Sequence, residues 1–566
     1  MDWDSHTALG RSVCRAWFLL LISTTIAASQ NKPLPRPKAD SSLQSILQSG
    51  RLVDLRWPVF SDVRSQADAF YRGSGYSLAW VKQGKPSVRA VEMINILQHA
   101  DEEGLLPEDY DASRWTDRLA HLNGPHSADE EFRFDVALTV CAMRYASAVR
   151  VGRINPKHFR FGLDVEHKRL DLPQFIRLIA NGADDLKSEF TQIEPPFIGY
   201  KATREALAHY TELASKDDRE KLPMPANTLF DTVFPGREYE GIPRLIRLLH
   251  LVGDLAADVT PDTNSYDGAL VQAVERFQER HGIRPNGYLN KDTIDAMNVP
   301  LSTRAEQLRL ALERYRWLRY NFSQPPVVVN LPEFRLRAFQ KGGGVGLAMN
   351  VNVGDAYDFQ TPVFENKILY VVFRPYWNVP PKILRNEVIP DIAENRDFVK
   401  DNAMEVTTLP GQVIASDTIS DSVLGQLRAG TLGVRQKPGP ENALRLLKVM
   451  FPNEHHVYLH DTPESSEMFA LGKGALSHGC MHLEHPAELA AWLLRDKPGW
   501  NFDRVEQAMH AGRDNFTVNL TTPVPILIFY TTAVVEEAGD THFFRDLYGH
   551  DATLEAALAR GYPYPD

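Results

Sequence analysis

The chain has 566 residues, a length that allows three or four domains. Hydrophobic residues make up 43% of it and charged residues 24%, which is ordinary for globular protein. The 62 Lys and Arg residues are outnumbered by 73 Asp and Glu residues, and the formal net charge is −11. This composition lacks the basic footprint of a nucleic-acid-binding protein, so we expect no nucleic-acid partner.

The N-terminus, residues 1–29, is typical of an export signal. Arg11 and Arg15 precede an apolar run at 16–22, and small residues follow at 27–29. A signal peptide has its charge, apolar core and cleavage site in this order. The run is shorter than the roughly 20 residues that cross a membrane, but an uncleaved N-terminal membrane anchor stays open as an alternative. We expect a periplasmic or cell-envelope location, with a flexible linker over 30–40.

The three cysteines agree with export. Cys14 lies within the predicted signal, which leaves Cys141 and Cys480 in the mature chain. Cys141 lies in an apolar helical pattern over 134–143, which predicts an inert core thiol. An oxidising compartment with so few cysteines suits an enzyme that must keep one thiol free.

From residue 41 to residue 241 the sequence predicts a mainly helical domain. Apolar positions recur every three or four residues, as at Ile94 and Leu97 or at Ile176 and Ile179. Short loops with Gly, Asn or Pro separate these stretches. The residue types of this region indicate no chemistry of their own.

A compact helical unit is predicted over 242–300, followed by a linker helix over 301–324. The unit contains the pattern AV-x-x-FQ at 273–278, then HG at 281–282, Gly287 and Thr293. This pattern resembles the three-helix peptidoglycan-binding domain. The resemblance implies wall binding, and a structural helical module is the alternative.

Strands are predicted from about residue 325. The runs 326–330, 334–339 and 367–373 are rich in β-branched and aromatic residues and are bounded by turn residues. The closing strands are predicted at 524–530 and 541–544, and the first should begin at Ile526 because Pro525 cannot donate to a ladder. These patterns predict a mostly β domain over 325–545 and a helical, peripheral tail over 546–566.

An insert over 378–440 interrupts the predicted sheet. Its sequence is helical and polar in pattern, and it is too long to be a simple connection. A segment of this kind beside a site is typical of a lid.

The densest chemistry lies between His460 and Cys480. Residues 461–476 separate His460 from the run Ser477-His478-Gly479-Cys480. A nucleophilic thiol needs a base, and a nearby histidine can lower its pKa below the free value of about 8.5. Gly479 permits a tight turn, so we expect the amides of Gly479 and Cys480 to face a developing oxyanion.

The spacing His-x16-Ser-His-Gly-Cys resembles the signature of the L,D-transpeptidases, cell-wall cross-linking enzymes with a YkuD-type catalytic domain. Further segments resemble the large, YcbB-like branch of that family, at 328–332, 361–362, 377–381, 435–440 and 458–463. Segments at 70–71, 78–80, 104–110 and 152–156 resemble the scaffold domain of the same enzymes. The resemblance implies a multidomain α+β protein with a helical scaffold, a peptidoglycan-binding-like domain and a YkuD-type domain with a helical lid.

The resemblance also implies a mechanism. The Cys480 thiolate attacks the carbonyl of the third residue of a donor tetrapeptide stem, and the terminal D-alanine leaves. The amine of an acceptor stem then attacks the thioester and forms a 3→3 cross-link. His460 is the implied general base and acid, the backbone carbonyl of Asp461 orients its ring, and Ser477 and His478 belong to the catalytic turn. Carbapenems are implied to acylate the same sulfur.

Substrate contacts are implied for three side chains. Tyr458 and Trp377 are candidates to line the donor pocket, and packing in a core is the alternative for both. His482 occupies a position where the family usually has Arg or Asn; it can hold the substrate when charged, and a shift of the pH optimum is the alternative. The implied partners are peptidoglycan stem peptides and glycan; the sequence does not identify a protein partner.

The main rival chemistry is metal binding, because His and Cys are good zinc ligands. Six histidines lie near Cys480: His455, His456, His460, His478, His482 and His485. Their spacing matches no zinc motif, and only one cysteine is nearby, so we predict no metal and no cofactor. Two further functions stay open: an L,D-carboxypeptidase or cysteine peptidase, which transfers the acyl group to water, and a non-catalytic wall-binding protein.

Overall fold

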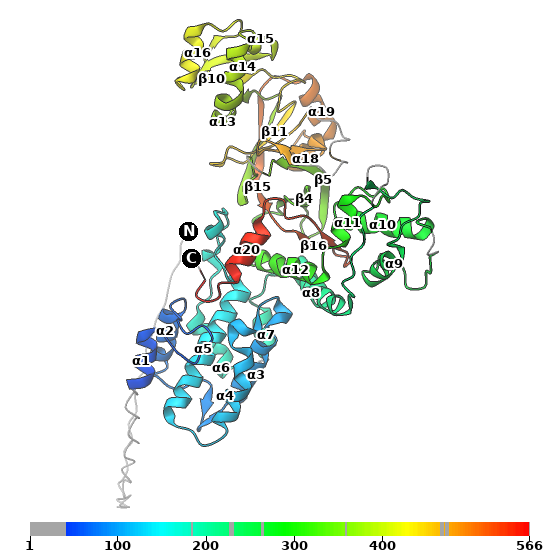
Figure 1. The fold of residues 1–566 in the computed structure, drawn as a ribbon. Coiled ribbons are helices and arrows are strands. Elements are labelled where there is room, and N and C mark those ends of the chain that lie inside the picture. Colours follow the sequence, from blue (N-terminus) through cyan, green and yellow to red (C-terminus); the bar gives the residue numbers. More distant parts are fainter. Residues whose placement is uncertain are drawn as a thin grey trace, which may run out of the picture.

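The computed structural model describes residues 41–182, 185–225, 231–261, 265–356, 359–463, 469 and 475–564. Figure 1 shows a helical domain at the bottom, a smaller helical unit on the right, a β-rich domain in the centre and a lid at the top. The predicted mixed α+β class is confirmed. The predicted signal and linker at 1–40 lie outside the described residues. Within the described part of the chain, no helix is long and apolar enough to cross a membrane.

The helical domain is built around the long helix α5, Ala128–Val151. Ser127 and Glu130 begin it with a capping box, in which each side chain accepts a hydrogen bond from the other's backbone N–H. Cys141 lies on this helix in the core with 1% of its surface exposed, as predicted. The surrounding elements are α1 (Ser41–Ser49), α2 (Arg64–Gly73), β1 (Val81–Lys82), β2 (Lys85–Pro86), α3 (Val88–Gln98), α4 (Trp115–Leu122), α6 (Leu172–Asn181), α7 (Leu186–Thr191) and short 3-10 helices at Ala100–Glu103, Pro107–Tyr110, Ala112–Arg114, Pro156–Phe159 and Glu166–Lys168.

The smaller unit contains α9 (Ile242–Leu251), α10 (Gly268–Arg280) and α11 (Lys291–Met297), which agrees with the predicted three helices. Its core also takes in Leu222, Val233 and Tyr239, so the packed unit begins before α9. Gln278 is fully buried and its side-chain amide bonds the backbone of the turn at 286–288. This glutamine therefore fixes the turn that follows α10.

Two long helices join these parts: α8 (Ile198–Lys216) and α12 (Leu301–Tyr315). The hairpin of β16 (Ala533–Val535) and β17 (Thr541–Phe543) packs on them with its buried residues Ala533, Val535 and Phe543. The prediction that 541–544 closes the main sheet is therefore wrong. This strand pairs with β16 and packs its apolar residues on helices, and sequence period alone does not distinguish these partners from the main sheet.

The central domain is a sheet with the strand order β13-β5-β14-β12-β11-β6-β15-β3-β4. Strand β4 also pairs with β5, so the sheet closes on itself and β13 lies outside the ring. Helices α18 (Pro486–Leu494) and α19 (Phe502–Ala511) contribute to its core. The strands are β3 (Val327–Asn330), β4 (Arg335–Phe339), β5 (Val345–Gly354), β6 (Phe364–Phe373), β11 (Leu447–Met450), β12 (Leu459–His460), β13 (Ala475–Ser477), β14 (Met481–Leu483) and β15 (Phe516–Phe529).

Strand β15 begins earlier than predicted, at Phe516 rather than Ile526. It pairs with β6 from Phe516 to Asn519, becomes irregular, and pairs again from Val524. Pro525 lies inside the strand close to this irregularity, where a missing backbone donor is tolerated. The parallel pairing with β3 does begin at Ile526, so the proline marks a change of partner and not the start of the strand.

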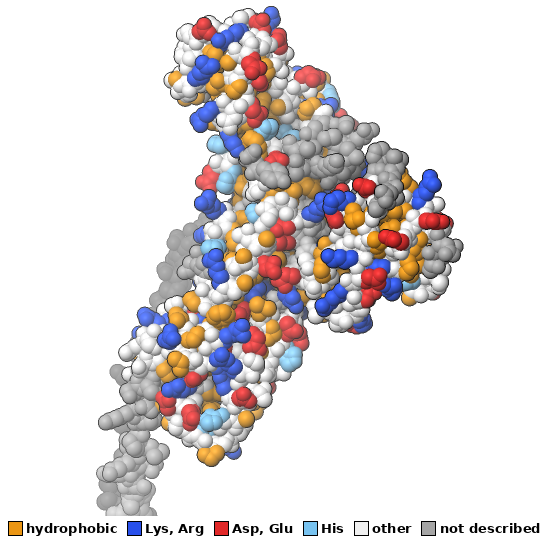
Figure 2. Space-filling model, viewed as in Figure 1, with side chains coloured by type: hydrophobic (Ala, Val, Ile, Leu, Met, Phe, Trp, Pro, Cys, Tyr) orange, Lys and Arg blue, Asp and Glu red, His pale blue; other side chains and the backbone are white. Residues whose placement is uncertain are grey.

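The lid, residues 377–436, is not simply helical and polar as predicted. It contains the sheet order β7-β10-β8-β9 and its own apolar core, which includes Ile392, Val399 and Val406. Charged side chains of both signs cover its outer surface in Figure 2. Its elements are β7 (Trp377–Asn378), α13 (Pro381–Ile383), a π-helix at Leu384–Val388, α14 (Ile389–Glu394), α15 (Phe398–Asp401), β8 (Met404–Thr408), β9 (Val413–Ala415), α16 (Asp421–Arg428) and β10 (Leu432–Gln436).

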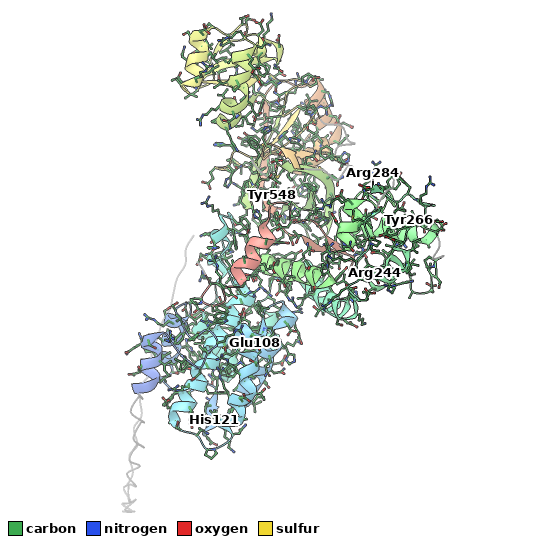
Figure 3. All side chains as sticks on the ribbon, in the orientation of Figure 1. Glu108, His121, Arg244, Tyr266, Arg284 and Tyr548 are labelled. Carbon is green, nitrogen blue, oxygen red and sulfur yellow. The ribbon has the colours of Figure 1, made fainter. Side chains whose placement is uncertain are left out.

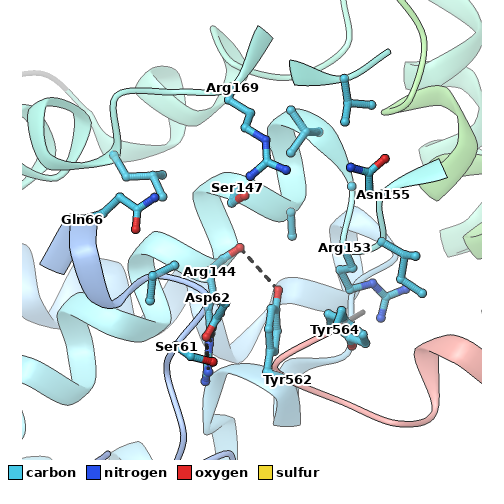
Figure 4. A pocket seen from close by; sticks show the side chains of 17 residues that line it. Ser61, Asp62, Gln66, Arg144, Ser147, Arg153, Asn155, Arg169, Tyr562 and Tyr564 are labelled. Atoms are coloured by element: carbon cyan, nitrogen blue, oxygen red, sulfur yellow. Dashed lines mark hydrogen bonds and ion pairs between the residues drawn. The ribbon is translucent and has the colours of Figure 1, made fainter. Parts of the chain in front are cut away.

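The C-terminal segment is helical, as predicted, but it is not peripheral. Helix α20 (His550–Leu558) buries Leu554 in the core of the central domain. The residues after it reach the scaffold, where Tyr562 stacks under the Arg144 guanidinium at 4.5 Å and Tyr564 donates a hydrogen bond to Asp109. Figure 4 shows both tyrosines beside a polar cavity of about 250 Å³. The segment therefore connects the core of the central domain to the scaffold.

Candidate active site

Strand β12 places the predicted base in the middle of the sheet. Leu459 pairs with Met481 of β14, and both side chains are fully buried in the core. Side chains alternate between faces along a strand, so Tyr458 and His460 lie on the other face. Cys480 and His482 lie beside them in parallel register. The pairing of β12 with β14 therefore brings His460 and Cys480 together, although they are far apart in the sequence.

His460 is buried, with 3% of its surface exposed. Its Nδ1 lies 2.6 Å from the backbone carbonyl oxygen of Asp461. A carbonyl can only accept, so Nδ1 carries the proton and Nε2 has a free lone pair in the neutral ring. Burial, followed by the nearby charges of His482 and Lys448, lowers the pKa of His460 well below its usual value. The imidazole is therefore a neutral base at physiological pH.

Asp461 contributes its backbone to this face and its side chain to the other. Its carboxylate accepts hydrogen bonds from the backbone N–H groups of Leu446 (3.2 Å) and Thr462 (2.8 Å), and lies 3.7 Å from Arg445. These contacts fix the peptide that holds the imidazole. Asp461 therefore positions the ring without presenting its carboxylate to the thiol face.

The Cys480 thiol is not activated at rest. Burial raises its pKa to about 11, and this outweighs a hydrogen bond from the Tyr458 backbone and the positive charge of Lys448, which both lower it. The expectation that the nearby histidine depresses the pKa of this thiol is wrong. Since His460 is kept neutral, it carries no charge that could stabilise a thiolate. The thiol proton must therefore leave as the sulfur attacks.

The turn before Cys480 is held by Ser477. Gly479 has a φ of +102°, a conformation that favours glycine. Its N–H donates to Ser477 Oγ at 3.2 Å, and the Ser477 hydroxyl in turn donates to the Cys480 carbonyl. The Gly479 amide is thus engaged inside the turn and does not face an oxyanion, contrary to expectation. Among the described residues, no acceptor is found for the Cys480 N–H, so this group is available as a donor.

A second layer of hydrogen bonds holds the turn from behind. Thr361 Oγ1 donates to the Gly479 carbonyl at 3.0 Å and accepts from the Gly354 N–H at 2.9 Å. Tyr548 accepts from the Thr361 N–H and donates to the Gly354 carbonyl. Figure 3 labels Tyr548 where α20 meets the sheet. Sequence reasoning singled out Thr361 but missed Tyr548, which lies in the segment predicted to be peripheral.

His478 points toward the lid and not into the turn. Its Nε2 lies 3.1 Å from Glu387 Oε1, on the π-helix of the lid. Its ring meets Phe359 edge-on with centroids 4.5 Å apart, and Lys382 of the lid lies 3.9 Å from the centroid of that phenyl ring. The turn at 477–480 and the base of the lid are therefore in direct contact. Departures into π-helix are frequent at functional sites.

The three candidate substrate contacts have different surroundings. Tyr458 lies beside the thiol, and burial with the charge of Cys480 raises the pKa of its hydroxyl to about 12. The His482 ring lies 4.7 Å from the His460 ring, centroid to centroid. Trp377 lies at the base of the lid, paired with Gln436 and packed on the lid core. The structure therefore brings Tyr458 and His482 to Cys480 and His460 and gives Trp377 a packing role.

The six histidines do not converge on one point. His460 and His482 are adjacent, but His455 lies against Phe364 and His485 lies near Glu484. Within the described part of the chain, no group of three or more potential ligands could hold a metal ion. The absence of a metal stays a prediction.

Sequence reasoning missed Lys448, the residue of β11 that pairs with His460. Its Nζ lies 3.6 Å from the centroid of the Tyr458 ring. A signal was present, because Lys448 is a lone charge between Leu447 and Val449 in a strand whose alternate residues are buried. Recognising it required the pairing of β11 with β12.

Three family models match the chain. Residues 65–207 match "Scaffold domain", residues 244–297 match "Putative peptidoglycan binding domain" and residues 325–526 match "L,D-transpeptidase catalytic domain". The matches confirm the three domain types that the sequence motifs indicated. They also confirm that the sheet with Cys480 and His460 is the L,D-transpeptidase catalytic domain.

One curated protein and two solved structures are similar to parts of the chain. A "Putative L,D-transpeptidase" of Haemophilus influenzae is 26% identical over 274 residues, which are 48% of this chain and 54% of that protein. The match thus spans about half the length of this relative. The crystal structure of an L,D-transpeptidase from Stackebrandtia nassauensis matches at 14% identity and a TM-score of 0.21, covering 52% of this chain and 97% of that one. An L,D-transpeptidase from Xylanimonas cellulosilytica matches at 13% identity and a TM-score of 0.17, covering 55% and 98%.

Proposed function

We propose that this chain, which carries an L,D-transpeptidase catalytic domain over residues 325–526, forms 3→3 peptidoglycan cross-links by cysteine acyl transfer. The observation that supports this best is the state of His460, a neutral imidazole whose protonated Nδ1 is held by a backbone carbonyl. Its basic Nε2 is on the sheet face that also carries Cys480. Such a ring can accept the thiol proton during attack.

In the proposed acylation, the Cys480 sulfur attacks the carbonyl of the third residue of a donor tetrapeptide while the thiol proton passes to Nε2 of His460. The carbonyl oxygen becomes an oxyanion and accepts a hydrogen bond from the Cys480 N–H, a type of contact worth about 3 kcal/mol. The carbonyl reforms as the C–N bond breaks, and His460 returns the proton to the departing D-alanine amine. A thioester on Cys480 remains.

The second half-reaction resolves the thioester. The side-chain amine of an acceptor stem attacks, its proton passes to His460, and the C–S bond breaks with return of the proton to sulfur. Water competes with the amine, so transfer depends on a cleft that excludes it. The contact between His478 and Glu387 supports a lid role, because it ties the lid to the catalytic turn.

We propose the cell envelope as the place of action. The two peptidoglycan-related domains favour this location, and the predicted signal at 1–29 would provide export. Peptidoglycan stems and glycan are the proposed partners. His482 and Tyr458, which lie beside the catalytic pair, are the side chains proposed to contact the donor stem.

Incubation of the purified protein with tetrapeptide muropeptides tests the proposal by mass spectrometry. We expect loss of D-alanine, a thioester on the intact protein and a dimer with a 3→3 bond, none of which should form with Cys480→Ala. Tripeptide without dimer would indicate an L,D-carboxypeptidase. Binding to peptidoglycan without any change in the muropeptides would indicate a wall-binding protein and would overturn the proposal.

A further inference from the structure

Lys448 is the residue of β11 that pairs with the proposed base, His460. Its neighbours Leu447 and Val449 are fully buried in the core, so Lys448 projects to the opposite face. Its antiparallel partner is His460, and directly paired residues have side chains on the same side of a sheet. Reading across β11, β12 and β14, the outer face thus carries Lys448, His460 and His482 in one row.

The ammonium group of this lysine is held by an aromatic ring. Nζ lies 3.6 Å from the centroid of Tyr458, which is within the range of a cation–π contact. Tyr458 is two residues before His460 and in parallel register beside Cys480, so the ring forms part of the wall around the sulfur. The contact fixes a long, flexible side chain at the thiol.

The surroundings of Lys448 hold little negative charge. On the β6 side its paired residue is Val372, and the titratable groups that face it from β12 and β14 are Tyr458, His460, Cys480 and His482. Among the described residues no carboxylate forms an ion pair with it. Burial lowers the pKa of Lys448 to about 8, and the opposing cause is the charge of Cys480. A buried cation of this kind is costly unless an anion forms beside it.

We propose that Lys448 compensates the negative charge that develops on the Cys480 sulfur, and that the ring of Tyr458 holds it there. This role rests on the proposed acyl transfer, in which the sulfur passes through a charged state between loss of its proton and formation of the C–S bond. Lys448 acts through the sulfur and forms no covalent bond, so it is a positioning residue. It keeps its own proton throughout, and His460 remains the proton carrier.

The same cation acts on both groups of the resting site. Its positive charge lowers the pKa of Cys480, against the effect of burial, and adds to burial in lowering the pKa of His460. A cation beside both groups favours a negative sulfur and disfavours a positive imidazole. Lys448 therefore helps to keep the base unprotonated and eases deprotonation of the nucleophile.

The test reads the thiol itself and needs no peptidoglycan. In a full-length background with Cys14→Ala and Cys141→Ala, Cys480 is the only thiol, and its alkylation by iodoacetamide is followed from pH 6 to 10 by intact mass. We expect Lys448→Met to slow alkylation about tenfold near pH 7.5, which is one unit of thiol pKa and the lower limit for loss of a nearby opposite charge. Lys448→Arg should keep the rate within about threefold, because the charge is retained.

A matched control is Lys367→Met, which removes an exposed lysine from β6 of the same sheet. Its alkylation profile should equal that of the parent. If Lys448→Met does not fold, as judged by circular dichroism, Lys448→Gln carries the same expectation. Superposition of the neutral variant's pH profile on the parent's would overturn the proposal.

The outcome is separable from that of the proposed function. If the parent forms no thioester from tetrapeptides but the neutral variant still alkylates more slowly, the acyl-transfer proposal fails and the electrostatic role of Lys448 stands. If tetrapeptides acylate the parent but the alkylation profiles superpose, only the role of Lys448 is lost.

Discussion

Charged and polar groups are buried in two regions of the molecule, and the two regions differ in the hydrogen-bond and ion-pair partners that these groups have. At the junction of scaffold and linker helix, the fully buried Glu313 accepts hydrogen bonds from the backbone of Arg153 and Ile154 and lies near the Arg316 guanidinium. Asp135 in the scaffold core likewise accepts from the Tyr71 hydroxyl and from backbone N–H groups. Each carboxylate there has several donors.

The sheet face that carries Cys480 and His460 has buried basic side chains and lacks nearby carboxylates among the described residues. Lys448, His460 and His482 lie in one row, and the nearest carboxylate of the same strand, Asp461, is turned away toward Arg445. Burial here shifts the pKa of Lys448, His460 and Cys480 away from their charged forms. A buried carboxylate that accepts several hydrogen bonds is held rigidly, whereas burial without counter-charges leaves groups that gain from a charge formed during a reaction.

The largest expected effect separates the two thiols. Cys480→Ala should abolish formation of any acyl-enzyme, whereas Cys141→Ala should leave it unchanged, because Cys141 is enclosed in the scaffold core. Intact-mass spectrometry after exposure to a carbapenem measures both variants. An adduct on the Cys480→Ala protein would show that the nucleophile lies elsewhere.

Loss of the base should change the pH dependence of acylation. In the wild type, neutral His460 and protonated Cys480 coexist from below pH 6.5 to about 11, so the rate should be nearly flat from pH 6.5 to about 8, above which Lys448 loses its charge. His460→Ala can react only as thiolate, about 1 in 10⁴ of the molecules at pH 7 for a pKa near 11. Its rate should fall by about 10²- to 10⁴-fold at pH 7 and rise about tenfold per pH unit.

The measurement is a pH series of carbapenem adduct formation on both proteins. Lys448 loses its charge above about pH 8, so the slope of the variant should be read below that pH. Equal rates for the two proteins near neutrality would show that His460 is not the base.

Removal of a buried carboxylate at the junction of scaffold and linker helix should lower the free energy of unfolding and leave the reaction unchanged. Glu313→Gln removes the carboxylate that lies near two buried guanidinium groups, those of Arg153 and Arg316, and we expect a loss of about 3–5 kcal/mol in the free energy of unfolding. Glu306→Gln, on the same helix, removes a partly exposed ion pair with Arg309 and should cost less than about 1 kcal/mol. Thermal unfolding compares the two variants. Similar midpoints would contradict the contrast drawn for the buried junction.

The smallest expected effect concerns the lid, because acylation itself should survive its removal. Asn378 and Arg435 are directly paired at its base, so an Asn-Gly turn can replace 379–434 and close a two-stranded hairpin. A shorter deletion would expose the apolar core around Ile392 and Val406. We expect thioester formation to continue, with a several-fold shift from cross-linked dimer toward hydrolysed tripeptide.

The ratio of dimer to tripeptide in muropeptide digests measures this shift. Glu387→Gln is the matched point variant, since it weakens the contact with His478 without removing the lid. An unchanged ratio in the lidless protein would contradict the role of the lid in excluding water.

An element of the fold could be predicted where its sequence pattern depends only on neighbouring residues. The helices of the small unit and the burial of Cys141 follow from apolar periodicity, which is a property of neighbouring residues. The early start of β15 and the docking of 541–543 on helices depended on partners far along the chain. The lid was misjudged because its apolar residues are spaced between polar ones and form a core only when strands β8 and β10 pair.

The sequence by itself determined the domain types, and the recognisable spacing of Cys480, His460 and Gly479 is the basis on which the reaction class is proposed. Only the tertiary structure decided their state: strand pairing put Lys448 beside the sulfur, burial kept the thiol protonated, and Ser477 engaged the Gly479 amide. Electrostatics and hydrogen bonding depend on distance in space, and residues brought together by a sheet leave no fixed interval in the chain.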